Sequence, residues 1–329
     1  MARWTSRRAV AAISTLVVTA GVAVRVPAAH ASGSAREDRR GCEARGPAPT
    51  AMSVDVAGET RSALVHVPTT LNRHKRAPVV LTFHGFGSTA ELQAGFDGMN
   101  ATADANGFIS VHPQGRFATV YPDIAGVGWD IFNPMSPDPG FVGALLDQLS
   151  AKVCVDSKRV YATGLSNGGG EARLLSCKLA DRIAAISAIA GDTAPLCPGG
   201  PSMPSLSFHG VEDMINPYYL GSPIFLQLPI ETAVASEALR NGCEGEPRVR
   251  AQSARVELLR WRNCDVPTLL YRLHEHGHSW PGRSYGVTRE DLLAFGFPPE
   301  IADNLLLRND DIDATELSWQ FFRRFSLDD

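Results

Sequence analysis

The chemistry that this sequence could perform is concentrated at Ser166, which lies in the pattern Gly164-Leu165-Ser166-Asn167-Gly168. The residues before the pattern are β-branched and aromatic, and those after it are apolar at helical spacing. A serine on a sharp turn between a strand and a helix is the arrangement of an exposed nucleophile. The flanking glycines have a mechanical reason, because side chains there would collide with the neighbouring strand and helix.

A nucleophilic serine needs a base to take its proton, a carboxylate to orient the base, and N–H donors for the oxyanion. The carboxylate should follow a later strand end, and Asp213 lies a few residues after the strand pattern that ends at Phe208. Glu212 and Asp192 are competing candidates, but Asp192 follows the preceding strand. Asp213 is therefore the predicted acid.

The predicted base is His278, which follows the last apolar strand pattern and comes directly after Gly277. His274, His276 and His278 alternate, and such spacing raises the alternative of a metal site. Alternation directs His276 to the other side if the strand persists, so we expect no metal and no cofactor. His84, His112 and His209 end strands and are predicted to support the site through hydrogen bonds.

Backbone amides complete the predicted site. The N–H of Asn167, directly after the serine, and the N–H of Phe86, on the loop after an early strand, are the expected oxyanion donors. Trp280 beside the histidine and Trp129 in a long loop are predicted to form an aromatic wall for the substrate. Packing inside the protein is the alternative for both indoles.

The elements that must position these residues alternate between strands and helices. Continuous apolar runs predict strands buried on both faces, and apolar residues at helical spacing predict the helices between them. Strands are predicted over 62–67, 78–83, 108–112, 160–164, 183–190, 205–208 and 268–273, and helices over 88–105, 141–152, 172–177, 231–240 and 313–325. This alternation indicates an α/β fold whose mostly parallel sheet carries helices on both faces.

Length and composition fit one globular catalytic domain. The chain has 329 residues, of which 44% are hydrophobic, and its formal charge of -4 gives no reason to expect nucleic acid as a partner. We expect a monomer whose partner is its substrate. The predicted organisation is a signal peptide over 1–31, a flexible lead-in over 32–55 and a single catalytic domain over 56–329. The segment 114–140 is too long for a simple connection, and such loops commonly carry function.

The N-terminus predicts secretion. Arginines precede an apolar run over 9–24, and Ala29-His30-Ala31 matches a signal cleavage site. The run is shorter than the roughly 20 residues that span a membrane, which argues against an anchor. Ser6-Arg7-Arg8 leaves open whether export uses the general or the twin-arginine route. We expect an extracellular protein with no membrane association after cleavage.

Six cysteines fit an oxidising compartment, and an even number predicts three disulfides. No C-x-x-C pair occurs, so a metal site is the weaker reading. Two of the predicted pairs each close a short stretch of chain, and the third would link the N-terminal segment to the core. The predicted pairs are Cys177 with Cys197, Cys243 with Cys264, and Cys42 with Cys154.

Five motifs in order resemble the secreted poly(3-hydroxybutyrate) depolymerase and feruloyl esterase group of α/β-hydrolases. They are Thr82-Phe83-His84-Gly85-Phe86-Gly87, the segment from Arg159 to Gly169, Ile183-Ala184-Ala185-Ile186, His209-Gly210-x-x-Asp213 and Gly277-His278-Ser279-Trp280-Pro281-Gly282. The resemblance runs from about residue 60 to the C-terminal helix and implies an α/β-hydrolase fold. It implies the same three catalytic residues and the same two oxyanion donors.

The resemblance implies a serine esterase, with a polyester depolymerase as the first expectation and a feruloyl or acetylxylan esterase as the alternative. A non-catalytic polymer-binding protein is a further alternative, but it should have a broken catalytic set, and all three members are present. The sequence departs from the family pattern at Gly170-Glu171 and at Ser236-Glu237-Ala238. Both departures fall where substrate choice could change.

Overall fold

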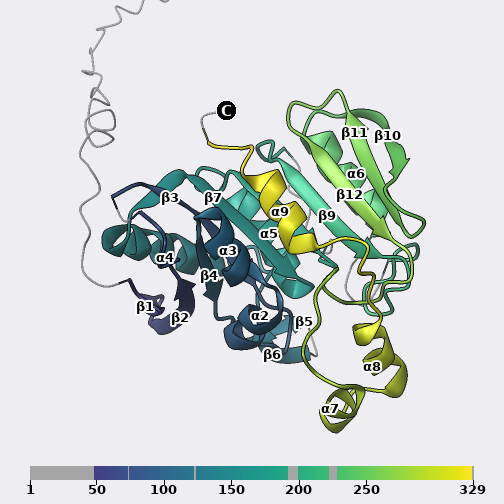
Figure 1. The fold of residues 1–329 in the computed structure, drawn as a ribbon, viewed down its shortest axis with the longest axis horizontal. Coiled ribbons are helices and arrows are strands. Elements are labelled where there is room, and N and C mark those ends of the chain that lie inside the picture. Colours follow the sequence, from purple (N-terminus) through teal and green to yellow (C-terminus); the bar gives the residue numbers. More distant parts are fainter. Residues whose placement is uncertain (1–47, 73, 122–123, 192–198, 222–227, 328–329) are drawn as a thin grey trace, which may run out of the picture. The chain divides into compact units, whose positions relative to one another are not determined.

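A ten-stranded sheet organises the described part of the chain (Figure 1). The computed structural model describes residues 48–327 except 73, 122–123, 192–198 and 222–227. The strand order is β1-β2-β4-β3-β7-β8-β9-β12-β11-β10, and β5 pairs with β6 in a separate hairpin. The strands are β1 (Ala51–Val56), β2 (Glu59–His66), β3 (Ala77–Phe83), β4 (Ile109–Pro113), β5 (Arg116–Tyr121), β6 (Ile124–Gly128), β7 (Val155–Leu165), β8 (Ala185–Ile189), β9 (Ser205–Gly210), β10 (Glu244–Ala251), β11 (Val256–Arg262) and β12 (Thr268–Leu273).

Neighbouring strands from β4 through β3, β7, β8 and β9 to β12 are parallel, and the pairs outside them are antiparallel. Parallel neighbours need crossover connections, and helices supply most of them. The helices are α2 (Ala90–Phe96), α3 (Met99–Asn106), α4 (Asp138–Lys152), α5 (Asn167–Lys178), α6 (Ile230–Arg240), α7 (Arg289–Ala294), α8 (Pro299–Leu306) and α9 (Ala314–Phe322). The mostly parallel α/β architecture predicted from the sequence is confirmed.

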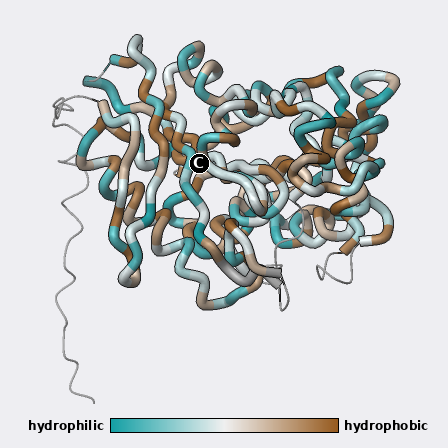
Figure 2. The backbone as a smooth tube through the Cα atoms, turned by 90° about the horizontal axis from the view of Figure 1, so that it is seen from below, coloured by the Kyte–Doolittle hydropathy of each residue, from teal (hydrophilic) through white to brown (hydrophobic). Residues whose placement is uncertain are grey.

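Successive side chains of the central strands enter two different cores. Val79 and Leu81 of β3 pack with residues of α4 and α5, whereas Val80 of the same strand packs with residues of α3 and α9. This period of two is the geometry of a strand whose two faces are both covered. Figure 2 shows hydrophobic and hydrophilic positions intermingled along the backbone as a whole.

Two predicted boundaries are wrong. Residues 51–55 belong to β1, which pairs with β2, so the predicted lead-in overlaps a strand. The helix predicted over 88–105 is two helices, because Gly98 adopts a left-handed φ of 72° between α2 and α3. Thr89 caps α2, and its side chain accepts a hydrogen bond from the Leu92 N–H.

Two hairpins occupy segments for which no strand was predicted. The long segment 114–140 contains β5 and β6, and the charged excursion between Cys243 and Cys264 contains β10 and β11. Strand β10 forms an edge of the sheet and is exposed along nearly its whole length. Its sequence lacks a strand-like apolar pattern because it has no buried face to fill.

The predicted disulfide between Cys243 and Cys264 is confirmed. Cys154 and Cys177 are also disulfide-bonded, and the partners predicted for them, Cys42 and Cys197, lie outside the described residues. The predicted signal peptide lies outside them as well. Within the described ranges, no helix has the length and apolar character needed to span a membrane.

Candidate active site

Ser166 lies at a strained turn between β7 and α5. Its φ of 56° and ψ of -121° are unusual for a residue with a side chain, and such strain is commonly stored at functional positions. A Cβ on Gly168 would lie 2.2 Å from the Phe83 carbonyl oxygen, and one on Gly164 would lie 2.5 Å from the Gly168 backbone. The close approach predicted from the glycines is therefore present.

Asp213 and His278 meet beyond the ends of two adjacent parallel strands. Asp213 follows β9 and His278 follows β12, and β9 pairs directly with β12. The imidazole Nδ1 of His278 lies 2.8 Å from Asp213 Oδ2, and both residues are buried. Nδ1 therefore carries the proton in this pair, and Nε2 is the nitrogen that can accept one from a hydroxyl. Ser166 follows β7 at the same edge of the parallel sheet.

Asp213 is held as a carboxylate by several donors. Its Oδ1 accepts hydrogen bonds from the backbone N–H groups of Ile215 and Asn216, at 2.9 and 2.8 Å. Nε2 of His209 lies 3.3 Å from Asp213 Oδ2 and 2.9 Å from the Asn216 carbonyl oxygen. Burial alone would raise the pKa of Asp213, but the charge of His278 and the hydrogen bonds from both histidines outweigh it and lower the pKa well below its ordinary value.

The loop after β3 lies against the serine. A Cβ on Gly85 would be 3.6 Å from Ser166 Cβ, and the Gly87 N–H donates to the Val127 carbonyl of β6 at 2.7 Å. The backbone around Phe86 therefore lies beside Ser166. Its N–H group is the one predicted to bind the oxyanion that forms when Ser166 attacks the substrate. The Phe86 side chain is 39% exposed.

The two tryptophans do not form the predicted aromatic wall. Trp129 is fully buried, its indole N–H donates to the His84 carbonyl, and its backbone exchanges two hydrogen bonds with the Asn167 side chain. Trp280 is also fully buried and donates to Thr315 Oγ1 at 2.9 Å. Trp129 therefore braces the loop beside the serine, and Trp280 packs in the core.

The remaining histidines have protein partners of their own. His84 accepts from the Gly115 N–H, and burial lowers its pKa to about 4. His112 lies 2.9 Å from Asp97 Oδ2, and His274 lies 3.1 Å from Glu257. His276 accepts from the Asn309 N–H at Nδ1 and lies 3.1 Å from the Ser279 carbonyl at Nε2. No cluster of three potential metal ligands occurs among the described residues.

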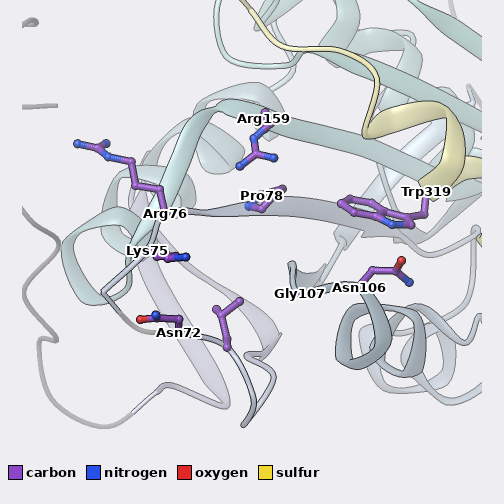
Figure 3. A pocket seen from close by; sticks show the side chains of 9 residues that line it. Asn72, Lys75, Arg76, Pro78, Asn106, Gly107, Arg159 and Trp319 are labelled. Carbon is purple, nitrogen blue, oxygen red and sulfur yellow. The ribbon is translucent and has the colours of Figure 1, made fainter.

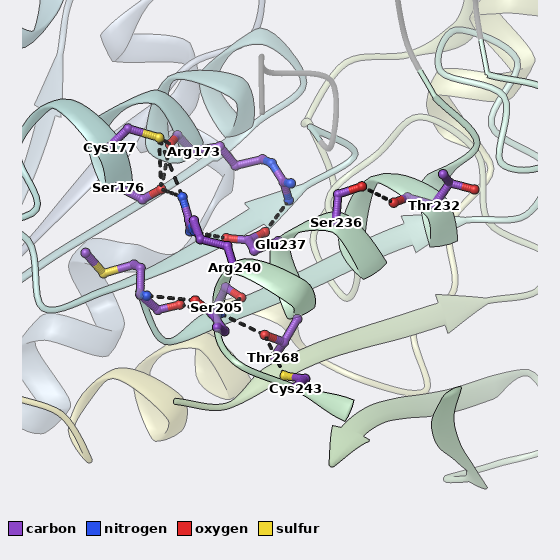
Figure 4. Close-up of polar contacts among 12 residues, drawn as sticks. Arg173, Ser176, Cys177, Ser205, Thr232, Ser236, Glu237, Arg240, Cys243 and Thr268 are labelled. Atoms are coloured by element: carbon purple, nitrogen blue, oxygen red, sulfur yellow. Dashed lines mark hydrogen bonds and ion pairs between the residues drawn. The ribbon is translucent and has the colours of Figure 1, made fainter. Parts of the chain in front are cut away.

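Glu171 and Glu237, which mark the two departures from the family motifs, are both buried rather than turned toward a substrate. Glu237 forms an ion pair with Arg173 at 2.7 Å and accepts a hydrogen bond from Arg240 at 2.9 Å, and so ties α5 to α6 (Figure 4). Breaking a buried pair of this kind costs far more than breaking one at the surface. The Glu237 cluster therefore steadies the helix that begins directly after Ser166.

Glu171 is fully buried in α5, and neither of its carboxyl oxygens has a hydrogen-bond partner among the described residues. Burial, followed by the charge of Asp138, raises the pKa of Glu171 well above its ordinary value, while Arg61 acts in the opposite direction. Glu171 is therefore neutral in the folded protein at mildly acidic pH.

Glu171 should make the folded state less stable as pH rises. The unfolded chain releases this proton near pH 4.5, whereas the folded chain retains it to higher pH. The free energy of unfolding should therefore fall by on the order of 1 kcal/mol per pH unit between the two pKa values. Glu171→Gln should flatten this dependence in urea unfolding from pH 5 to pH 9. Parallel curves for the two proteins would show that Glu171 titrates normally.

A separate pocket of about 230 Å³ lies away from these residues. Its lining includes Lys75 just before β3, Pro78 near the start of β3, Arg159 in the first half of β7, and Trp319 of α9 (Figure 3). The pocket lies toward the N-terminal ends of the parallel strands β3 and β7, whereas Ser166 follows the C-terminal end of β7. The pocket is therefore not part of the candidate active site.

No family model matches the chain. It is 29% identical over 268 residues to NocK of Nocardia uniformis subsp. tsuyamanensis, a protein named as an esterase, across 72% of this chain and 75% of NocK. It is 30% identical over 237 residues to feruloyl esterase B of Piromyces equi, across 67% of this chain and 42% of that enzyme. The chain thus spans less than half the length of feruloyl esterase B.

The structure is similar to that of an acetyl xylan esterase from Aspergillus awamori, with a TM-score of 0.54 at 13% identity, over 75% of this chain and 99% of the other. At this identity the likeness concerns the fold, and the fold is that of the α/β-hydrolases. The chain is thus similar in sequence to named esterases and in fold to an esterase of the α/β-hydrolase type. The protein is a carboxylic ester hydrolase.

Proposed function

We propose that this protein is a secreted serine esterase that releases hydroxycinnamoyl groups, such as ferulate, from plant cell-wall polysaccharide. The contact between His278 Nδ1 and Asp213 Oδ2, at the same edge of the sheet as the strained Ser166, carries the assignment of a serine mechanism. The secreted location is supported by the N-terminal apolar run and its cleavage motif.

The proposed reaction proceeds in two steps. His278 Nε2 takes the proton of Ser166 as the serine oxygen attacks the ester carbonyl carbon, and the amides of Phe86 and Asn167 stabilise the oxyanion. His278 then gives the proton to the leaving alcohol, and an acyl-serine remains. Water then attacks the acyl-serine as the same histidine takes its proton. The histidine returns that proton to the serine oxygen, which leaves as the carboxylic acid is released.

Similarity to feruloyl esterases supports the choice of substrate. Besides feruloyl esterase B, the chain is 23% identical over 285 residues to feruloyl esterase D of Neurospora crassa, across 86% of that protein. These relatives favour the feruloyl esterase alternative over polyester depolymerisation. Acetylxylan is the second polysaccharide ester to consider, because the compared fold includes an acetyl xylan esterase.

Parallel assays on three substrates test the proposal. The purified protein should release ferulate from methyl ferulate and from feruloylated arabinoxylan. The kcat/KM for these two substrates should be at least about 100-fold above the kcat/KM for release of acetate from acetylated xylan. A preference of about 3 kcal/mol in transition-state binding is enough for this ratio. An emulsion of poly(3-hydroxybutyrate) should remain turbid. Clearing of the emulsion without release of ferulate would reject the hydroxycinnamoyl assignment and would instead support a polyester depolymerase.

A further inference from the structure

One side chain of α8 contacts both loops that carry the proposed acid and base. The carboxamide oxygen of Asn304 accepts from the Met214 N–H at 3.0 Å and from the His278 N–H at 3.2 Å. Its nitrogen donates to the Glu212 carbonyl at 2.6 Å. Asn304 is 5% exposed, so water competes little for these bonds. Its carboxamide thus bonds to the base and to both chain neighbours of Asp213.

The chain that follows Asn304 holds the base loop at further points. The carbonyl of Leu307 accepts from the Gly277 N–H and from Ser279 Oγ, both at 2.9 Å, and the Asn309 N–H donates to His276 Nδ1 at 2.9 Å. A Cβ on Gly277 would lie 2.0 Å from the Asn304 carbonyl oxygen. Only glycine permits this approach, so residues 304–309 lie directly against the base loop.

The backbone hydrogen bonds between the acid loop, which follows β9, and the base loop, which follows β12, do not extend as far as Asp213 and His278. The Val211 N–H donates to Leu273 at 2.8 Å, and the Glu212 N–H donates to His276 at 3.2 Å. Beyond these bonds, the acid and base loops are joined by the contact between Asp213 and His278 itself and by Asn304. The carboxamide therefore fixes one loop against the other at the level where the proton is transferred.

We propose that Asn304 is a positioning residue of this esterase, which aligns the imidazole of His278 with Ser166 by holding the acid and base loops in register. The inference rests on the catalytic roles proposed above for Asp213 and His278. Asn304 acts through these two residues and reaches neither substrate nor the reacting atoms. Displacement of a reacting group by about 1 Å costs roughly 100-fold in rate, so the effect should appear in kcat.

Asn241 provides a matched control. It is fully buried, and its carboxamide bonds to the backbone of Met203 and to Thr268 Oγ1. These contacts lie at the start of β9 and β12, whereas Asn304 acts beyond the other end of the same two strands. Asn241→Ala therefore removes an equivalent carboxamide from the same strand pair without touching the catalytic loops.

The experiment compares Asn304→Ala, Asn304→Asp and Asn241→Ala in the full chain, with 4-nitrophenyl acetate as a substrate that does not depend on the hydroxycinnamoyl assignment. Asn304→Ala should lower kcat by roughly 10- to 100-fold with KM within about twofold of wild type. It should also broaden the downfield NMR signal of the proton between His278 and Asp213. Asn241→Ala should lower the melting temperature but keep kcat within about twofold of wild type.

Asn304→Asp separates an effect on the position of His278 from a general loss of stability. It also allows kcat to be measured if Asn304→Ala does not fold. When protonated, its carboxyl can accept and donate as the carboxamide does, but when ionised it loses the donor to Glu212. Its kcat relative to wild type should therefore rise as pH falls. Wild-type kcat in both Asn304 variants, or an equal loss in Asn241→Ala, would overturn the inference. Wild-type kcat in Asp213→Asn would instead reject the proposed catalytic pair.

Discussion

Ser166→Ala is expected to lower kcat/KM for ester hydrolysis by about 10⁴- to 10⁶-fold, because the covalent step has no nucleophile without the hydroxyl. The fold should be retained. Alanine also carries a Cβ, so it occupies the φ of 56° at much the same conformational cost as serine. Rates of ester hydrolysis and thermal unfolding curves on the same preparations measure the two effects.

The matched control for Ser166→Ala is Ser176→Ala. Ser176 is buried on α5, the helix that begins directly after Ser166, and donates to the Arg173 carbonyl at 2.7 Å, so its loss should affect stability rather than rate. A fluorophosphonate probe should label wild type and Ser176→Ala and leave Ser166→Ala unlabelled. Near-native hydrolysis by Ser166→Ala would refute the serine mechanism.

Asp213→Asn is expected to lower kcat by about 10⁴-fold at neutral pH, which is the typical loss when the carboxylate that orients a catalytic histidine is replaced by an amide. The amide removes the charge that stabilises the imidazolium, and its nitrogen can donate to His278 Nδ1, which favours the wrong tautomer. The two amide bonds to Oδ1 can persist, so the loop should keep its conformation. Steady-state kinetics over a range of pH measure the effect.

Glu212→Gln is the control for Asp213→Asn, since Glu212 is the neighbouring carboxylate and its side chain accepts a hydrogen bond from the His276 N–H at 3.2 Å. It should keep kcat within about tenfold of wild type, because the loss of one backbone contact is worth about 1 kcal/mol. An equal loss of kcat in both variants would contradict the assignment of Asp213 as the acid.

The pH dependence of stability gives a second readout for Asp213. Because the pKa of Asp213 is lowered in the folded state, the carboxylate stabilises the fold above the ordinary aspartate pKa of about 3.9, and this contribution disappears as pH falls toward the folded pKa. In Asp213→Asn, the free energy of unfolding should fall less steeply below about pH 4 than in wild type. The comparison separates the loss of charge from a loss of packing.

The parts of the fold that could be predicted are those whose pattern is set locally. The buried strand over 77–83 is apolar throughout because both of its faces are covered. The break between α2 and α3 was missed, although Asp97-Gly98 is a pair typical of turns and Gly98 adopts a left-handed φ of 72° there. The β10–β11 hairpin was missed because its outer strand has no buried face, and therefore no periodic apolar signal.

The predicted site divides in the same way. The glycines around Ser166 and the order of serine, acid and base indicate the chemistry before any coordinates. The burial of Trp129 and Trp280 was not predictable, because an aromatic residue in a loop or beside a histidine has the same sequence signature whether it faces substrate or core. Asn304 gave no signal, since an asparagine in a short amphipathic helix becomes distinctive only when two loops from elsewhere in the chain bond to it.

Strand β10 has a consequence for association between molecules. Its outward N–H and C=O groups could template another strand, but the segment Glu244-Gly245-Glu246-Pro247-Arg248-Val249-Arg250-Ala251 places charges of both signs and a proline along that border. Proline cannot donate to a ladder, and charges must be stripped of water before a second strand can dock. Concentrated solutions of the protein should accordingly resist growth of intermolecular β-structure from this side of the molecule.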